Sequence, residues 1–193
     1  MELLIAGLVL FLGAHSARIF FEGARQRFIE QRGEKAWKGL YSLVSIAGFV
    51  LIVYGFGQAQ QAPGVVWMPP MGLRHAASLL VLLAFVLLAA AYVPGNHIKA
   101  RVRHPMVLAV KVWALAHLLV VGRDYAMLLF AAFLVWAVLD FRAARARDRA
   151  QGTQYPPGSM PRTVVAVGVG AVLWAAFAFW AHGAWIGVRP FGV

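Results

Sequence analysis

Uninterrupted apolar runs are the feature of this sequence that most restricts its fold. Six runs are each close to the roughly 20 residues that an α-helix needs to cross the hydrocarbon core of a bilayer. They cover residues 3–21, 39–56, 72–92, 105–121, 125–141 and 163–181. Turn-forming sequences rich in Gly and Pro separate several of them, and no internal repeat is evident. We therefore predict an all-α, polytopic membrane helix bundle of about six transmembrane helices, in which residues 1–193 form a single domain.

The composition agrees with a bilayer environment. Hydrophobic residues make up 62% of the chain and charged residues 13%, whereas a soluble domain is about half apolar and one quarter charged. There is no cysteine, which excludes iron–sulfur clusters, thiolate zinc sites and cysteine nucleophiles. The net charge of +11 comes mostly from short loops between apolar runs. We attribute it to topology and anionic lipid headgroups, and we expect no nucleic-acid partner.

Basic residues are distributed unevenly between the loops. Three loops hold thirteen Lys and Arg residues together, namely 22–38, 92–104 and 142–162. The two intervening loops, 57–71 and 122–124, hold only Arg123. Cytoplasmic loops of membrane proteins carry the excess of Lys and Arg. We therefore expect the three basic loops on the cytoplasmic side and both termini on the non-cytoplasmic side.

Four ionisable residues lie within the predicted spans: His15, Arg18, Lys111 and His117. Such residues are costly in a membrane and usually face the interior of the bundle. Arg18 and Lys111 could extend toward the headgroups, and a single histidine could simply hydrogen-bond a neighbouring helix. Two histidines on different spans with cations nearby suggest haem instead. His15 and His117 would ligate the iron, and Arg18 or Lys111 would pair with the propionates.

Other chemistries find little support in the sequence. It has no glycine-rich phosphate loop, no GxSxG turn and no pair of carboxylates inside a span. A zinc site is an open alternative to haem, although no HExxH motif supports it. His104 stands at the start of the fourth span, directly before Pro105, and its role stays open at this point.

Five long stretches resemble the NnrU family of membrane proteins. They are FLGAHSAR at 11–18, GEKAWKGLYSLVSIAGFVLIVYGFG at 33–57, AAYVPGNHIKAR at 90–101, HPMVLAVKVWALAHLL at 104–119 and FRAARARDRAQGTQYP at 141–156. The likeness extends to the tail sequence WIGVRPFG, so that it covers nearly the whole chain. Membership implies a multi-pass protein of the bacterial inner membrane, associated with nitrite and nitric oxide reduction.

The NnrU family is in turn similar to the plant 15-cis-zeta-carotene isomerase, a membrane enzyme that uses haem b. The resemblance matches the ligands of that enzyme to His15, which Ser16 follows, and to His117, which ends the sequence WALAH. It implies isomerisation or redox chemistry on a lipophilic substrate. The isomerase has a cysteine implicated in ligand exchange where this chain has Ala114, so an exchange from histidine to cysteine cannot occur here.

Two other functions compete with a haem enzyme. The Arg103-His104-Pro105 triplet resembles a motif of membrane methyltransferases that use S-adenosylmethionine, but the region that holds their paired glutamates has no glutamate here. A non-enzymatic role is the other alternative, as a nitric oxide sensor or as an assembly factor for a denitrification enzyme.

Overall fold

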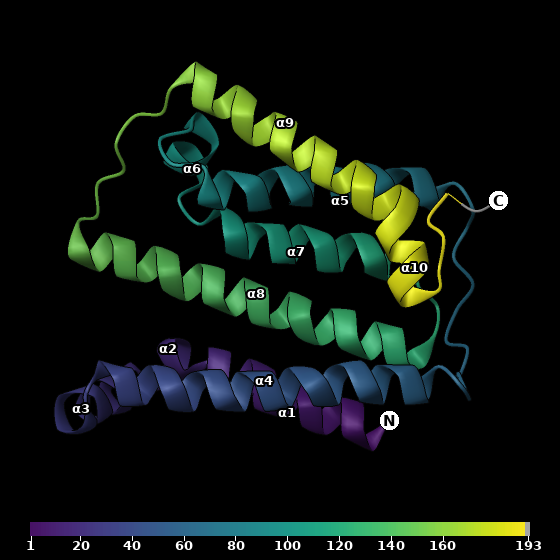
Figure 1. The fold of residues 1–193 in the computed structure, drawn as a ribbon, viewed down its shortest axis with the longest axis horizontal. Coiled ribbons are helices and arrows are strands. Elements are labelled where there is room, and N and C mark those ends of the chain that lie inside the picture. Colours follow the sequence, from purple (N-terminus) through teal and green to yellow (C-terminus); the bar gives the residue numbers. More distant parts are fainter. Residues whose placement is uncertain (192–193) are drawn as a thin grey trace. The chain divides into compact units, whose positions relative to one another are not determined.

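The computed structural model of the protein describes residues 1–191, and every regular element among them is helical. Figure 1 shows the order of the elements along the chain. They are α1 (Glu2–His15), α2 (Ala17–Phe20), α3 (Glu22–Arg32), α4 (Glu34–Ala59), α5 (Leu73–Tyr92), α6 (His97–Val102), α7 (Pro105–Leu118), α8 (Asp124–Gln151), α9 (Met160–Ala176), the π-helix η1 (Phe177–Ala181) and α10 (His182–Ile186). The predicted all-α class is confirmed.

Four helical segments in the described part of the chain are long and apolar enough to cross a membrane. They are α4, α5, α8 and the run Met160–Ile186, which joins α9, η1 and α10. The other two predicted spans appear as α1 and α7, which have 14 residues each. At 1.5 Å per residue such a helix is about 21 Å long, short of a hydrocarbon core of roughly 30 Å. The four long apolar segments support the prediction of a membrane protein. Six complete crossings stay a prediction, because α1 and α7 are too short to cross alone.

The chain divides into two compact units. Unit 1 contains Met1–Met68 and Val121–Ala143, and unit 2 contains Pro69–Val120 and Ala144–Val193. The helices α1 to α4 therefore belong to unit 1, together with most of α8. The helices α5, α6, α7, α9, η1 and α10 belong to unit 2, together with the last residues of α8.

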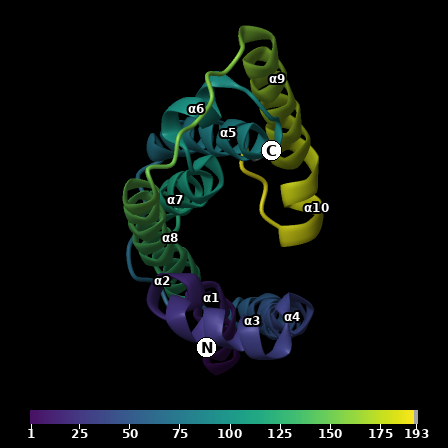
Figure 2. The same cartoon turned by 90° about the vertical axis from the view of Figure 1, so that its left-hand side faces the viewer.

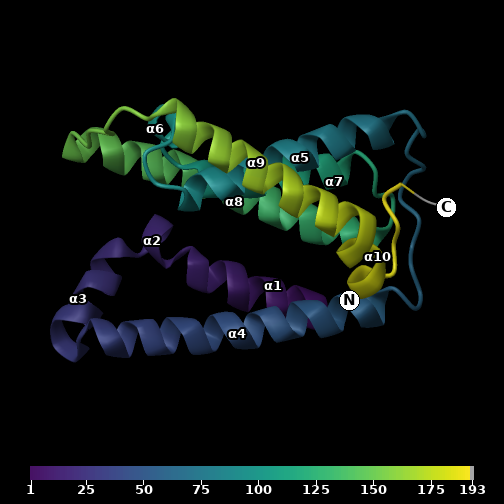
Figure 3. The same cartoon turned by 45° about the horizontal axis from the view of Figure 1, so that its top comes forward.

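Unit 1 is organised around the pair α1 and α4, which lie side by side in Figures 1 and 3. Glycines let their backbones approach closely. A Cβ atom on Gly7 would come within 2.5 Å of the Ile52 nitrogen, and one on Gly48 within 2.6 Å of the Phe11 nitrogen. Such contacts replace the hydrophobic effect, which cannot drive helix association inside a bilayer.

The loop after α4 is tied to the start of α8 within unit 1. The Trp67 indole donates to the Val121 carbonyl at 2.8 Å, and the Gly64 amide donates to the Asp124 carboxylate at 3.1 Å. These bonds satisfy polar groups of a loop that has no regular structure of its own. They also account for Asp124, an acid that the sequence places in a short turn without an evident partner.

Unit 2 is built on α5, which packs against both α7 and α9 (Figure 2). Its contact face is rich in alanine, including the fully buried Ala90. On α9, a Cβ atom at Gly170 would come within 2.5 Å of the Val86 Cα. Asn96, only 1% exposed, caps α6 by accepting from the Lys99 amide and donates to the Ala90 carbonyl. This one side chain thus links the end of α5 to the start of α6.

Candidate functional site

His15 is the last residue of α1 and is surrounded by aromatic rings of unit 1. Its ring stacks on Phe11 at a centroid distance of 4.2 Å and lies 5.1 Å from Tyr41 and 6.0 Å from Trp136. Its Nδ1 lies 2.7 Å from the Phe11 carbonyl oxygen. Because a carbonyl can only accept, Nδ1 carries a proton, and in the neutral imidazole the lone pair is therefore on Nε2. The surroundings therefore fix both the orientation of the ring and its tautomer.

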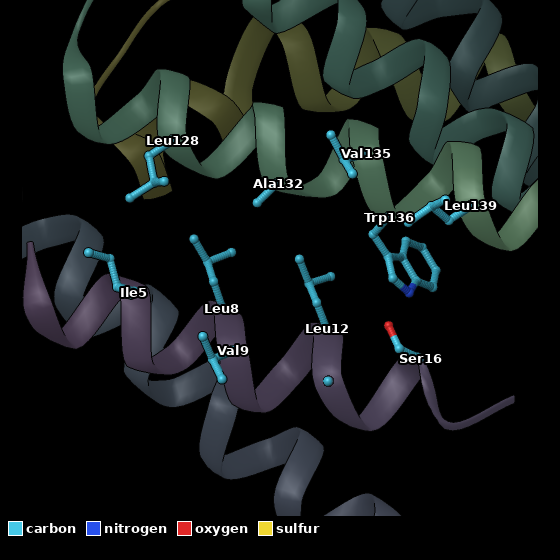
Figure 4. A pocket seen from close by; sticks show the side chains of 11 residues that line it. Ile5, Leu8, Val9, Leu12, Ser16, Leu128, Ala132, Val135, Trp136 and Leu139 are labelled. Atoms are coloured by element: carbon cyan, nitrogen blue, oxygen red, sulfur yellow. The ribbon is translucent and has the colours of Figure 1, made fainter. Parts of the chain in front are cut away.

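An open apolar groove of unit 1, with a volume of about 360 Å³, runs between α1 and α8 beside His15. Aliphatic side chains such as Leu8 and Leu12 line most of its length, and Trp136 and Ser16 lie at one end (Figure 4). The Trp136 indole nitrogen is buried and has no hydrogen-bond partner among the described residues. The groove therefore joins a long apolar wall to a polar end that is next to a histidine.

Arg18 lies outside the helix that carries His15. The predicted first span is interrupted at Ser16, which separates α1 from the single-turn helix α2, and again at Phe21. Arg18 falls on α2 and is exposed. The predicted span ran through both interruptions because apolar residues resume at Ile19–Phe21 after the polar stretch that contains Ser16 and Arg18.

His117 lies in the last turn of α7, in unit 2. Its Nδ1 donates to the Trp113 carbonyl at 2.8 Å, and its ring lies 5.3 Å from the Trp113 ring. Lys111, about a turn and a half earlier on α7, is half-buried. Ala114, the position of the isomerase cysteine, is completely buried.

The two predicted ligand histidines share the same local structure. Each lies in the last turn of a 14-residue helix, and each donates through Nδ1 to the carbonyl four residues earlier. Histidines that bind metals through Nε2 characteristically donate the other ring N–H in this way. His15 belongs to unit 1 and His117 to unit 2, and their pairing on one iron stays a prediction.

His182, the first residue of α10, lies next to His117. The two ring centroids are 6.5 Å apart and the ring planes differ by 15°. The Nδ1 of His182 donates to the Val188 carbonyl at 2.6 Å. Sequence reasoning could not find this pair, because 65 positions separate the two residues and no spacing rule relates them.

His104 belongs to a separate polar cluster of unit 2. Its Nε2 donates to the Asp148 carboxylate at 2.8 Å, and the Tyr155 hydroxyl donates to the same carboxylate at 3.1 Å. Asp148 is only 7% exposed and is the only acidic side chain of unit 2. Burial, followed by the hydrogen bond to Asp148, raises the pKa of Tyr155 above its ordinary value, so the phenol stays a donor at neutral pH.

A strained turn at Arg103 positions His104 in this cluster. Arg103 has φ 69° and ψ −49°, and the His104 amide donates to the Val102 carbonyl at 2.8 Å. These values describe a γ-turn of the rare, strained kind. The Arg103 guanidinium lies 5.6 Å from the centre of the Tyr155 ring. The Arg-His-Pro triplet thus forms a turn that joins α6, α7 and α8, and its resemblance to methyltransferases stays a prediction.

Among the described residues there is no group of three or more His, Cys, Asp or Glu side chains that could hold a metal ion. A protein-only zinc site of the usual kind therefore has no candidate in residues 1–191. Three histidines have an Nδ1 that donates to a backbone carbonyl and are candidates for a cofactor that needs only imidazole ligands: His15, His117 and His182.

Comparison with known proteins identifies the family of this chain. No curated protein and no solved structure matches the chain. The model of the family described as "NnrU protein" matches residues 3–190, which is nearly the whole chain. The protein therefore belongs to the NnrU family.

Proposed function

We propose that this protein is a haem b protein of the bacterial inner membrane, with His15 and His117 as the iron ligands. The observation that carries the proposal is the hydrogen bond from each Nδ1 to a backbone carbonyl, at 2.7 Å and 2.8 Å. It fixes the orientation of each ring and places a proton on Nδ1, so that the lone pair of the neutral imidazole is on Nε2, the nitrogen that would bind iron.

The surroundings of both histidines suit a porphyrin. Aromatic rings flank each imidazole, and a haem requires an apolar slot between helices with cations for its propionates. We assign the propionate contacts to Arg18, three residues after His15, and to Lys111, six residues before His117.

We further propose that the protein acts on a lipophilic molecule. The bound haem would supply one-electron redox chemistry or a binding site for a small ligand such as nitric oxide. The groove beside His15 supports an apolar substrate, since its walls are aliphatic and its polar end carries the Trp136 N–H. A long molecule with one hydrogen-bond acceptor fits this pattern, and lipid-exposed helices would let it enter from the bilayer.

The proposed topology has six crossings and both termini on the non-cytoplasmic side. Thirteen Lys and Arg residues in the loops 22–38, 92–104 and 142–162 support the orientation. With α1 and α7 about 21 Å long, the residues that follow each helix would complete the crossing. Both ligands would then lie inside the membrane rather than at its surface.

Haem content per protein chain tests the ligand assignment. We expect His15→Ala and His117→Ala each to reduce the haem bound to purified protein at least about tenfold, because each removes an axial ligand. His75→Ala and His97→Ala serve as matched controls and should leave it unchanged. Normal haem content in both of the first two variants would rule out the assignment.

A further inference from the structure

The groove of unit 1 is bounded by one face of α1 and one face of α8. Its lining residues run from Ile5 to Ser16 on α1 and from Leu128 to Leu139 on α8, and on each helix they follow the three- and four-residue spacing of a single face. Each stretch covers a separation of eleven positions, so the groove is about 16 Å long. It is therefore long enough for an extended hydrocarbon chain.

The lining of the groove favours an uncharged occupant. Every described residue that lines it is apolar except Ser16 and Trp136, and none of them is ionisable. A carboxylate or a phosphate would lose its hydration there without gaining a charged partner, which is costly in an apolar environment. The groove thus differs from a site for a fatty acid or for the head of a phospholipid.

The polar end of the groove has a hydrogen-bond donor without an acceptor. The Trp136 indole nitrogen is buried and has no partner among the described residues, although a buried tryptophan N–H usually finds one. The Ser16 hydroxyl points toward this nitrogen in Figure 4. A rotation about its Cα–Cβ bond moves the hydroxyl aside, admits an acceptor to the indole and lets the hydroxyl donate to the same atom. A carbonyl oxygen, which has two lone pairs, can accept from both groups.

The depth of Trp136 restricts which carbonyl compounds can reach it. Trp136 lies twelve positions after Asp124, the first residue of α8, and so about 18 Å along the helix. In the proposed topology α8 starts at the non-cytoplasmic surface, which places the donor inside the hydrocarbon core of roughly 30 Å. The ester carbonyls of phospholipids lie outside that core, at the level of the headgroups. The acceptor therefore belongs to a molecule that dissolves entirely in the core.

We propose that the groove binds a quinone with an apolar chain. The chain lies along the aliphatic walls, and one carbonyl oxygen of the ring accepts from the Trp136 N–H and the Ser16 hydroxyl. A quinone is uncharged, and its flat ring can stack on the indole. The His15 ring lies 6.0 Å from the Trp136 ring, so the quinone is held next to the histidine that the proposed function makes a haem ligand. This inference rests on the proposed function in taking the groove to hold a lipophilic molecule, and it names the class of that molecule.

Binding of a tritiated decyl-para-benzoquinone to haem-free, full-length protein in detergent tests the hydrogen bond. Trp136→Phe keeps an aromatic ring but removes the N–H, and we expect it to weaken binding about threefold to tenfold. Trp180→Phe, at a tryptophan that is 67% exposed, is the control and should bind as the unmodified protein does.

A competitor without carbonyl groups tests the head of the ligand. Unlabelled decylbenzene has the same chain as the probe, and we expect it to displace the probe about tenfold less effectively than the unlabelled quinone does. Equal displacement by the two competitors, or unchanged binding in Trp136→Phe, overturns the proposal.

A substitution at Gly13 tests the location of the chain. Gly13 lines the groove, and a Cβ atom there would meet no heavy atom within 4 Å. Gly13→Leu therefore leaves the helix packing unchanged but fills part of the groove, and we expect it to weaken quinone binding about tenfold or more. Gly57→Leu is the matched control, because a Cβ at Gly57 also meets nothing within 4 Å and Gly57 is not among the described lining residues. Full binding in Gly13→Leu, with helix content intact by circular dichroism, contradicts the proposal.

These measurements separate failure of this inference from failure of the haem assignment, because they use haem-free protein. A protein that takes up no haem but binds the quinone through Trp136 refutes the haem assignment and upholds the quinone site. A protein that loads haem through His15 and His117, with quinone binding indifferent to Trp136→Phe and Gly13→Leu, upholds the haem assignment and refutes the quinone site.

Discussion

At the residue scale, isolated polar side chains in apolar segments were the most informative signal. His15 and His117 could be selected from the sequence because nothing in a lipid-facing helix requires an imidazole. Their Nδ1 hydrogen bonds could not be predicted, since they depend on the rotamer that each ring adopts. Asp148 and Tyr155 were missed because their partner, His104, lies 44 and 51 positions away. No local pattern identifies such a contact.

The Tyr155 hydrogen bond predicts a difference in alkaline stability. The pKa of Tyr155 is raised in the folded protein by burial, then by the hydrogen bond and charge of Asp148. The stabilisation is therefore fully present below the unfolded pKa and is lost as pH rises through the folded pKa. We expect Tyr155→Phe to be less stable by about 1 kcal/mol at neutral pH, with the difference vanishing at strongly alkaline pH.

Unfolding midpoints measured from pH 7 to 11 check this prediction, with Tyr54→Phe as the control for an exposed tyrosine. A difference between Tyr155→Phe and the unmodified protein that persists undiminished at high pH would contradict it.

At the element scale, apolar runs located the helices better than they located the helix ends. Four predicted spans appear as long helices, whereas α1 stops at His15 and α7 stops at Leu118. Hydropathy is insensitive to the end of α7 because Leu119, Val120 and Val121 beyond it are also apolar. Beyond the end of α1, apolar residues resume at Ile19 after Ser16 and Arg18. The π-helix η1 at Phe177–Ala181 was also not predicted, because its residues continue the apolar run of α9 without a break. The sequence shows Gly7 and Gly48, but it does not show that each of them contacts the backbone of the other helix.

Replacing two glycines of α4 by alanine is expected to change the free energy of unfolding in opposite directions. In Gly48→Ala the new Cβ would meet the Phe11 backbone at 2.6 Å, so α1 must move away and we expect a loss of about 1–3 kcal/mol. In Gly39→Ala, on the same helix, the Cβ meets no atom within 4 Å, and we expect a gain of about 0.5–1 kcal/mol. Thermal unfolding in detergent measures both changes. Equal effects of the two substitutions would show that α1 and α4 do not pack closely.

At the scale of the whole molecule, the sequence established the class of protein and the family. The membrane character followed from 62% hydrophobic residues, and the family from motifs spread along nearly the whole chain. The division into two compact units was not foreseen, because it reflects which helices contact each other rather than any linker in the sequence. The number of crossings stays a prediction based on the apolar runs, and their orientation stays a prediction based on charge.

The absence of cysteine makes the proposed orientation directly measurable. A single cysteine at Gln61 lies in a loop expected on the non-cytoplasmic side, and a single cysteine at Gln154 lies in a loop expected in the cytoplasm. We expect a membrane-impermeant maleimide to label Gln61→Cys in intact cells, and Gln154→Cys only after the inner membrane is permeabilised. The reverse labelling pattern would show that the orientation is opposite to the proposed one.

The central claim is that the protein binds haem b between two imidazoles, and an absorption spectrum tests it most directly. Protein purified in mild detergent from cells supplied with a haem precursor should show a strong Soret band. Reduction with dithionite should then produce sharp α and β bands, because two histidine ligands make the iron low-spin. A colourless protein that stays colourless after haem is added would contradict the claim.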